Sequence, residues 1–238
     1  MLKSFNFTQF VLISLGFACF TVIGTLSHEL GHFAVAKYLG MENIELHYGS
    51  VSFDNPKIDS QRALYTKYEI QIREDKDFPE KAVYEKLSSD IKYNSLMVRL
   101  GGPFQTMLTG TIGLIVLILF GERFKINGNL KLIGWMWIYL SLFWLRQTAN
   151  FFHAFIIFII NRFKWRHRSD EMVLAHNLHL PIYSISFITG LIGILILLWI
   201  TFFYLPRNVV RTFILGGFIG GITGYLIWFV WLGKYILP

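Results

Sequence analysis

The chain has 238 residues, of which 54% are hydrophobic, 17% aromatic and 16% charged, whereas a soluble domain carries about 25% charged residues. This composition excludes intrinsic disorder and disfavours an ordinary water-soluble enzyme. The single cysteine, Cys19, excludes a disulfide framework and a multi-cysteine metal site. The formal net charge is +7, but four basic residues alternate between Arg162 and Arg168 beside an apolar segment, which indicates a membrane surface and not nucleic acid.

Long apolar runs dominate the chain. A helix needs about 20 apolar residues to cross a hydrocarbon layer of about 30 Å. Such runs lie near residues 10–39, 97–120, 131–160, 182–204 and 210–233. The sequence therefore predicts an all-α polytopic membrane protein with about five transmembrane helices and a small α+β extramembrane insert after the first helix. Polar residues interrupt the third run, so we expect a break at residues 146–150. If the two halves crossed the membrane separately, every later segment would have the opposite membrane orientation.

We divide the chain into a first transmembrane helix (residues 1–40), an insert (41–96) and a helical core (97–238). The insert holds 11 of the 15 acidic residues. Residues 44–48 and 68–72 alternate with period two and predict strands, whereas Pro79–Asn94 has the apolar spacing of a surface helix. We therefore expect a β-rich cap followed by that helix.

The distribution of Lys and Arg near the span ends predicts the orientation of the chain. Nine of these residues lie on the side of the insert and six on the other side, which puts the insert in the cytoplasm. The last span carries glycines at four-residue spacing, which predicts close helix packing. These glycines are Gly216, Gly220 and Gly224, and Gly217 with Gly221.

The first span contains the sequence His28-Glu29-Leu30-Gly31-His32. Four residues of helix put His28 and His32 on one face, about 6 Å apart along the axis, which suits two imidazoles that bind one metal ion. Glu29 then lies in the position of a general base for a metal-activated water. An ionisable residue at mid-membrane costs about 2.5–3.5 kcal/mol, and a divalent cation would offset that cost. The alternative is a polar patch between helices or around a water-filled cavity.

A catalytic zinc site needs a third protein ligand, since such sites combine three protein groups with water. The candidates are Asp170, Glu171, His153, His176 and His179. Asp170 is preferred, because a single crossing by the third span brings it to the side of His28 and His32. Its alternative role is a helix N-cap, which Ser169 could also provide. His153 is a second ligand candidate, and His176 and His179 are expected to lie out of reach.

Four pieces of sequence in chain order suggest a family. They are His28-Glu29-Leu30-Gly31-His32, Gly101-Gly102-Pro103, Asn150 and Ser169-Asp170. Over residues 20–181 this order resembles the site-2 protease family of intramembrane zinc metalloproteases, in particular its small bacterial members. The resemblance implies that His28, His32 and Asp170 bind one Zn²⁺ ion. It also implies a bacterial cell membrane as the location, and the charge distribution puts the active site toward the cytoplasmic side.

The resemblance further implies that Glu29 is the catalytic base and that Asn150 is a hydrogen-bond donor near the substrate. The chain departs from the family here, because it lacks the proline that follows this asparagine and the glycine that follows Asp170. Asn150 could instead cap a broken third span. Arg146 is expected to snorkel or to pair with a carboxylate, and Gly101-Gly102-Pro103 to allow a close backbone approach.

The expected function is therefore that of a zinc endopeptidase that cuts membrane-anchored proteins within or beside a transmembrane helix. Its partners would be a membrane-protein substrate and the lipid bilayer. The exposed edge of a strand in the insert could pair with an unwound substrate. The alternative is a non-catalytic membrane scaffold or binding protein on the same fold. Metal transport is disfavoured, because the last two spans contain no Asp, Glu or His.

Overall fold

The computed structural model describes residues 6–160 and 169–238, and it is mostly helical (79%) with two small sheets. Five helical stretches are long and apolar enough to cross a membrane: Phe7–Tyr38, Lys81–Phe124, Leu132–Ile160, Ser184–Tyr204 and Val210–Ile236. They agree in number and position with the predicted spans, and are consistent with an integral multi-pass membrane protein. The predicted basic cluster from Arg162 to Arg168 lies outside the described residues.

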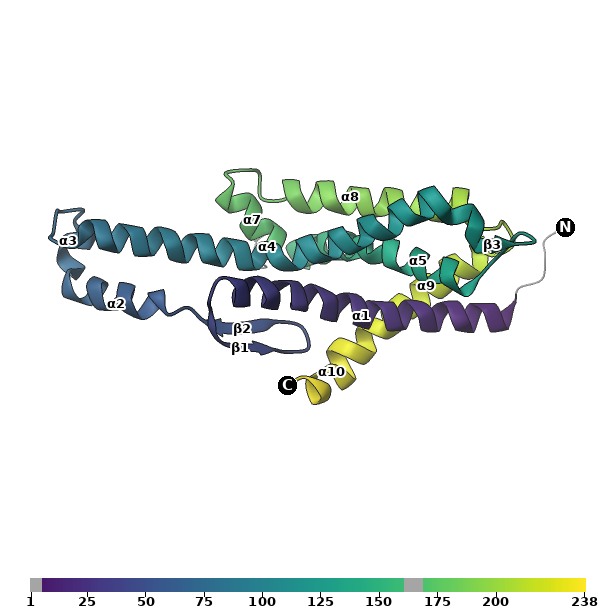
Figure 1. Ribbon diagram of the computed structural model, residues 1–238, viewed down its shortest axis with the longest axis horizontal. Helices are drawn as coiled ribbons and strands as arrows, with labels where there is room; N and C mark the ends of the chain where they lie inside the picture. The colour runs from purple at the N-terminus through teal and green to yellow at the C-terminus, as the bar shows by residue number, and fades with distance from the viewer. Residues whose placement is uncertain (1–5, 161–168) are drawn as a thin grey trace.

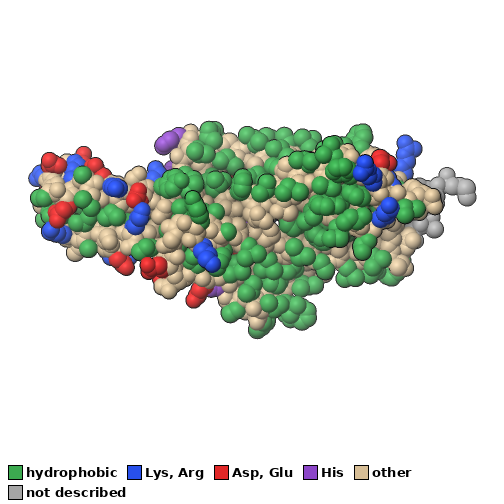
Figure 2. All heavy atoms as spheres, in the orientation of Figure 1, with side chains coloured by type: hydrophobic (Ala, Val, Ile, Leu, Met, Phe, Trp, Pro, Cys, Tyr) green, Lys and Arg blue, Asp and Glu red, His purple; other side chains and the backbone are tan. Residues whose placement is uncertain are grey.

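The surface reflects this division into apolar and polar parts. Figure 2 shows hydrophobic side chains over most of the helical bundle, whereas charged side chains gather at the two ends of its long axis. One charged end is the arm formed by α2 (Lys57–Lys67), α3 (Glu69–Arg73) and the start of α4 (Lys81–Phe120). The other surrounds the short segments η1 (Gly121–Phe124), β3 (Lys125–Ile126) and β4 (Asn129–Leu130). An apolar belt between charged ends is the arrangement expected of a protein in a bilayer.

Helix α1 (Phe7–Tyr38) is the central element of the fold. It begins at Asn6, whose side chain accepts a hydrogen bond from the Gln9 amide, and Gly40 follows it with φ +70°. Its 32 residues correspond to about 48 Å of helix. It packs against α4 and also against α9 (Val210–Tyr225), which crosses it obliquely (Figure 1).

Helix α4 combines two elements that the sequence suggested were separate. The surface helix predicted over Pro79–Asn94 and the span predicted near 97–120 form one helix of 40 residues. The segment between them contains neither glycine nor proline before Gly101, so nothing ends the helix. Its first half packs beside α2, where Lys57 contacts Asp90 at 2.6 Å and Lys67 contacts Glu80 at 2.8 Å. The insert is therefore a projecting helical arm beside a small hairpin.

The strand predictions for the insert are half right. β1 (Glu42–Leu46) confirms a strand close to residues 44–48, and it pairs antiparallel with β2 (Val51–Asp54), which the sequence analysis missed. The strand predicted at 68–72 is wrong, because Glu69–Arg73 is helical. Five alternating residues also fit one helical turn, and here Arg73 pairs with Glu69 at 2.7 Å with the i,i+4 spacing of a helix.

The third apolar stretch is helical throughout, but a short 3₁₀ turn divides it into two α-helices. This turn lies earlier in the sequence than the predicted break. The stretch consists of α5 (Leu132–Ser141), η2 (Leu142–Trp144) and α6 (Leu145–Ile160). The tight turn lies at 142–144 and not at 146–150. It falls where α4 approaches, since a Cβ on Gly113 would lie 2.5 Å from the Ser141 amide nitrogen. The polar residues of 146–150 remain helical because other helices supply their hydrogen-bond partners, as described below.

The C-terminal half completes the bundle. It comprises α7 (Asp170–Asn177), α8 (Ser184–Trp199), the π-helical segment η3 (Ile200–Tyr204), α9, the π-helical segment η4 (Leu226–Leu232) and α10 (Gly233–Ile236). A buried apolar cluster joins α1, α4, α5, η3 and α9 through Ile13, Leu117, Ile138, Ile200 and Phe213. This cluster fixes one end of α1, and the polar residues lie toward the other.

The glycine spacing in α9 has the predicted effect at one face. A Cβ would lie 2.9 Å from the Ile13 side chain at Gly216 and 2.7 Å from the Ala18 carbonyl at Gly224, and at Gly220 it would overlap the Ser14 carbonyl oxygen. These three glycines therefore allow α9 to contact α1 closely. Gly217 also meets α1, because a Cβ there would lie 3.0 Å from the Phe17 ring. The same prediction is wrong for Gly221, which faces open space.

Candidate metal centre

Helix α1 carries three buried polar side chains within two turns. His28, Glu29 and His32 are 2%, 4% and 8% exposed. The two imidazole rings lie on one face, with centroids 4.8 Å apart and planes at 81°. The structure thus places both imidazoles side by side, as the spacing predicted.

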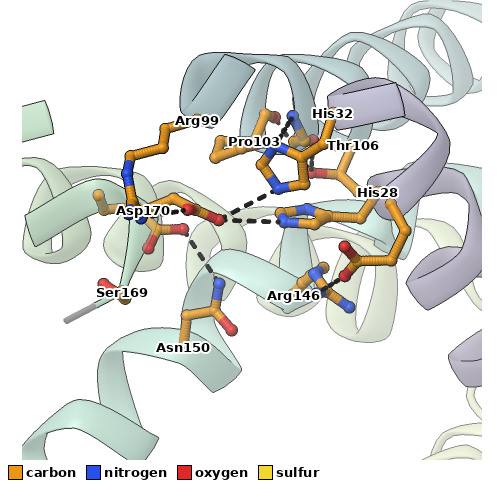
Figure 3. Close-up of polar contacts among 12 residues, drawn as sticks. His28, His32, Arg99, Pro103, Thr106, Arg146, Asn150, Ser169 and Asp170 are labelled. Atoms are coloured by element: carbon orange, nitrogen blue, oxygen red, sulfur yellow. Dashed lines mark hydrogen bonds and ion pairs between the residues drawn. The ribbon is translucent and has the colours of Figure 1, made fainter. Parts of the chain in front are cut away.

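Asp170 completes a group that could hold a metal ion. Its Oδ2 lies 3.5 Å from His28 Nε2 and 3.2 Å from His32 Nε2 (Figure 3). The three ligand atoms are all within 4.8 Å of one another. Tetrahedral zinc with bonds of about 2.0–2.2 Å requires ligand atoms roughly 3.3 Å apart. The residue types and the two Asp170 distances therefore suit one zinc ion.

Asp170 is available for this role because its neighbour caps the helix. Ser169 is the N-cap of α7, and its hydroxyl accepts a hydrogen bond from the Met172 amide at 3.4 Å. Burial alone would raise the pKa of Asp170, but the adjacent His28 and His32 hold that pKa below its usual value. Arg99 lies 3.5 Å from the second carboxylate oxygen, Oδ1. The carboxylate is thus oriented with Oδ2 toward the imidazoles.

The hydrogen bonding of His32 fixes which ring nitrogen is available to a metal. Its Nδ1 lies 2.6 Å from the Val98 carbonyl oxygen, and since a carbonyl only accepts, Nδ1 carries the proton. The Gly102 amide, 3.3 Å from the same nitrogen, therefore does not donate to it. Nε2 then faces the Asp170 carboxylate, and this contact needs a cation: either a second proton on the ring or a metal ion. A carbonyl behind the imidazole is the usual outer partner of a metal-bound histidine.

Close contact between α1 and α4 shapes the space beside the imidazoles. A Cβ on Gly101 would lie 2.5 Å from the Gly31 carbonyl, and one on Gly31 would overlap the Gly101 carbonyl. A Cβ on Gly102 would overlap His32 Nε2 and lie 2.6 Å from His28 Nε2. The predicted close backbone approach is confirmed. Glycine at position 102 leaves the Nε2 atoms free on that side.

Glu29 pairs with a cation from the third apolar stretch. Arg146 NH2 lies 3.4 Å from Glu29 Oε1, and Arg146 NH1 donates to Thr25 Oγ1 at 3.1 Å. The glutamate side chain is 5% exposed. The expectation that Arg146 pairs with a carboxylate is confirmed, although the sequence did not identify the partner. An arginine inside an apolar run was the signal that could have suggested Glu29.

Asn150 lies near the site, but its amide group is engaged. Its Nδ2 donates to Glu171 Oε1 at 3.0 Å, and Glu171 is 1% exposed. The interaction joins α6 to α7. The structure does not bring the other ligand candidates together with His28 and His32. These candidates were Glu171, His153, His176 and His179. Of the candidates weighed, Asp170 alone joins His28 and His32 in the described part of the chain.

A large cavity leads from this site into the apolar part of the bundle. Its volume is about 1080 Å³, and its wall includes His28, Glu29, Arg146 and Asp170. Along α1 the lining extends from His32 to Phe17, about 22 Å of helix. The opposite walls come from α6 and α9, and strand β2 borders the cavity through Val51 and Phe53. The site is therefore accessible from a space lined mainly by apolar side chains.

No family model matches the chain, and comparison with curated proteins and with solved structures finds no significant match. The resemblance to site-2 proteases therefore depends on the sequence motifs alone. Fold and site together define a helical protein with five apolar spans and a His-His-Asp group whose two histidines are buried.

Proposed function

We propose that this protein is an intramembrane zinc-dependent endopeptidase. The observation that carries the proposal is the convergence of His28 Nε2, His32 Nε2 and Asp170 Oδ2 on the wall of a cavity that Glu29 also lines. Two histidines and a carboxylate with an adjoining glutamate are the residue types of zinc peptidase sites. The bacterial cell membrane and a cytoplasm-facing site remain expectations from the resemblance and the charge distribution.

The proposed roles follow from the chemistry of these residues. His28, His32 and Asp170 would hold the zinc ion, which when bound supplies a Lewis acid for the peptide carbonyl and lowers the pKa of a water. Glu29 takes a proton from the attacking water and delivers it to the leaving amine. The contact with Arg146 orients the glutamate for this transfer. The other carboxylate oxygen of Asp170 stays with Arg99.

The cavity suits a substrate that enters from the membrane. Its lining is mainly apolar and it reaches about 22 Å along α1. A helical substrate keeps its amides in internal hydrogen bonds, so it must unwind before a peptide bond can reach the site. Strand β2 borders the cavity and pairs with β1 on one side only in the described structure. Its second edge could pair with the unwound segment.

The test compares zinc content and cleavage in matched variants. Protein purified in detergent should contain one zinc per chain by mass spectrometry, and Asp170→Ala should lose it. Glu29→Gln should retain zinc but fail to cleave co-expressed membrane-anchored substrates. Glu122→Gln is the matched control, because Glu122 has an 86% exposed side chain at the opposite end of the bundle. If wild type and Glu29→Gln both bind zinc and process the substrates equally, the peptidase proposal is wrong and the non-catalytic scaffold is the alternative that stands.

A further inference from the structure

Arg146 is a cation that the fold positions at the site but does not fully engage. Its guanidinium has five N–H donors. One nitrogen donates to Thr25, and a second makes a single contact of 3.4 Å with Glu29. Its Nε is buried with no hydrogen-bond partner among the described residues. The geometry is not the bidentate pairing in which arginine and carboxylate bind each other most strongly.

The environment of Arg146 makes this incomplete pairing unusual. Its side chain is 22% exposed and lines the cavity beside apolar side chains such as Phe143 and Leu145. A charge inside a membrane-spanning bundle is energetically costly and marks a functional position by default. The buried Nε does not reach the cavity, but each of the two terminal nitrogens keeps a second N–H donor. A guanidinium with such donors on a cavity wall is suited to bind an anion that forms there.

The residue that the resemblance assigned to this task is engaged elsewhere. Asn150 lies one helical turn after Arg146 on α6, and its amide donates to the buried Glu171. One of the two N–H donors of this amide is held by Glu171, so turning the group toward a substrate oxygen would leave that buried carboxylate unpaired. The chain also lacks the proline that follows this asparagine in the family. Asn150 therefore ties α6 to α7, next to Asp170.

We propose that Arg146, and not Asn150, donates hydrogen bonds to the oxyanion that develops on the scissile carbonyl. This inference rests on the proposed peptidase function. As the water oxygen bonds to the carbonyl carbon, the π electrons move to the carbonyl oxygen and the water proton goes to Glu29. Arg146 N–H groups stabilise the negative oxygen. The C–N bond then breaks, and Glu29 returns its proton to the amine nitrogen.

The binding experiment uses zinc-loaded protein and N-phosphoryl-Leu-Phe, whose tetrahedral anion mimics that intermediate. Arg146→Gln should raise the Kd for this probe about 100-fold at unchanged zinc content. Arg146→Lys, which keeps the charge but not the planar fork, should restore part of the affinity. Asn150→Ala and the matched control Arg211→Gln, at an exposed position, should change it less than threefold. Equal binding by wild type and Arg146→Gln would overturn the inference.

Probe affinity, read together with cleavage kinetics, separates oxyanion binding from a role exerted only through Glu29, because a lower kcat is expected of both. Loss of one oxyanion donor lowers kcat by about 10²–10³-fold, so Arg146→Gln should show this loss at nearly constant KM. Glu29→Gln should abolish cleavage without weakening the binding of the probe. If Arg146→Gln does not fold, Arg146→Lys alone should still show a weaker probe affinity and a lower kcat than wild type; unchanged values would overturn the inference.

These outcomes distinguish the two proposals. If Glu29→Gln is inactive while Arg146→Gln cleaves and binds the probe like wild type, the peptidase function stands and the role of Arg146 is wrong. If wild type and Glu29→Gln process every substrate equally, the peptidase function fails, and the role of Arg146 fails with it.

Discussion

Helix α1 makes two close, glycine-mediated contacts, one near each end, and they serve different purposes. Toward its C-terminal end, Gly31 meets Gly101 of α4, and Gly102 lies against the two imidazoles. Toward its N-terminal end, Gly216 and Gly220 of α9 meet the backbone and side chains near Ser14. Both contacts bring helices together through the absence of a Cβ. At one end this absence leaves space beside chemical groups, whereas at the other it only permits packing.

The two contacts differ in what a methyl group would displace. At Gly220 the obstructing atoms are the backbone of Ser14 and the Cβ of Phe17, which cannot move without the helices. At Gly102 they belong to the ends of the His28 and His32 side chains, which can rotate. The same substitution should therefore damage stability at one contact and metal binding at the other.

The largest expected effect is at Gly102. Gly102→Ala would force the imidazoles away from their common position, so we expect zinc content to fall from one per chain to near zero. The cost in folding should be small, because side chains absorb the clash. Zinc by mass spectrometry and the Tm of zinc-free protein measure the two effects. Zinc retained at wild-type affinity would contradict the geometry described here.

At the contact between α1 and α9 the same substitution should reduce stability and leave metal binding unchanged. Gly220→Ala should lower the free energy of unfolding by about 1–3 kcal/mol, the usual cost of overpacking, while folded molecules still bind zinc. Gly221→Ala is the matched control, because nothing lies within 4 Å of its Cβ position. Alanine there should be neutral or stabilising by up to about 1 kcal/mol through helix propensity. Unfolding in detergent compares the two, and equal stabilities would show that the α1–α9 contact is not tight.

The fold features that the sequence predicted are those set by composition over a long window. Five apolar runs identify five helices, because the length needed to cross a bilayer is a property of the whole run. Short segments were less certain. Residues 68–72 alternate like a strand but form a helix, because five residues do not distinguish the two periods without knowledge of the partners. The turn at 142–144 depends on how closely α4 approaches Ser141, which no local pattern encodes.

The site shows the same division. His28 and His32 are one helical turn apart, so their proximity is local and was predictable. Asp170 could be chosen only through the expected topology, and it lies with them. The partner of Asn150 was beyond prediction, because the direction of a polar side chain depends on which helices face it. For Arg146 the charge inside an apolar run indicated a carboxylate partner, but not which carboxylate. Sequence alone therefore left open whether Asn150 had a free amide.

The smallest expected effect concerns the N-cap that frees Asp170. Removing a serine cap typically costs about 1 kcal/mol, and α7 has only eight residues with Asp170 as the first. Without the Ser169 hydroxyl, Asp170 can itself turn toward the free amides of the helix start, in competition with the imidazoles. Because 1.4 kcal/mol corresponds to tenfold in affinity, Ser169→Ala should weaken zinc binding by about fivefold in competition titrations with a chelator.

Ser184→Ala is the control, because it removes a hydroxyl that bonds only the Pro181 carbonyl in the described structure, and it should leave zinc affinity unchanged. Equal zinc affinity in Ser169→Ala and wild type would mean that the cap does not control the carboxylate, and that Arg99 and the imidazoles alone hold Asp170 in place.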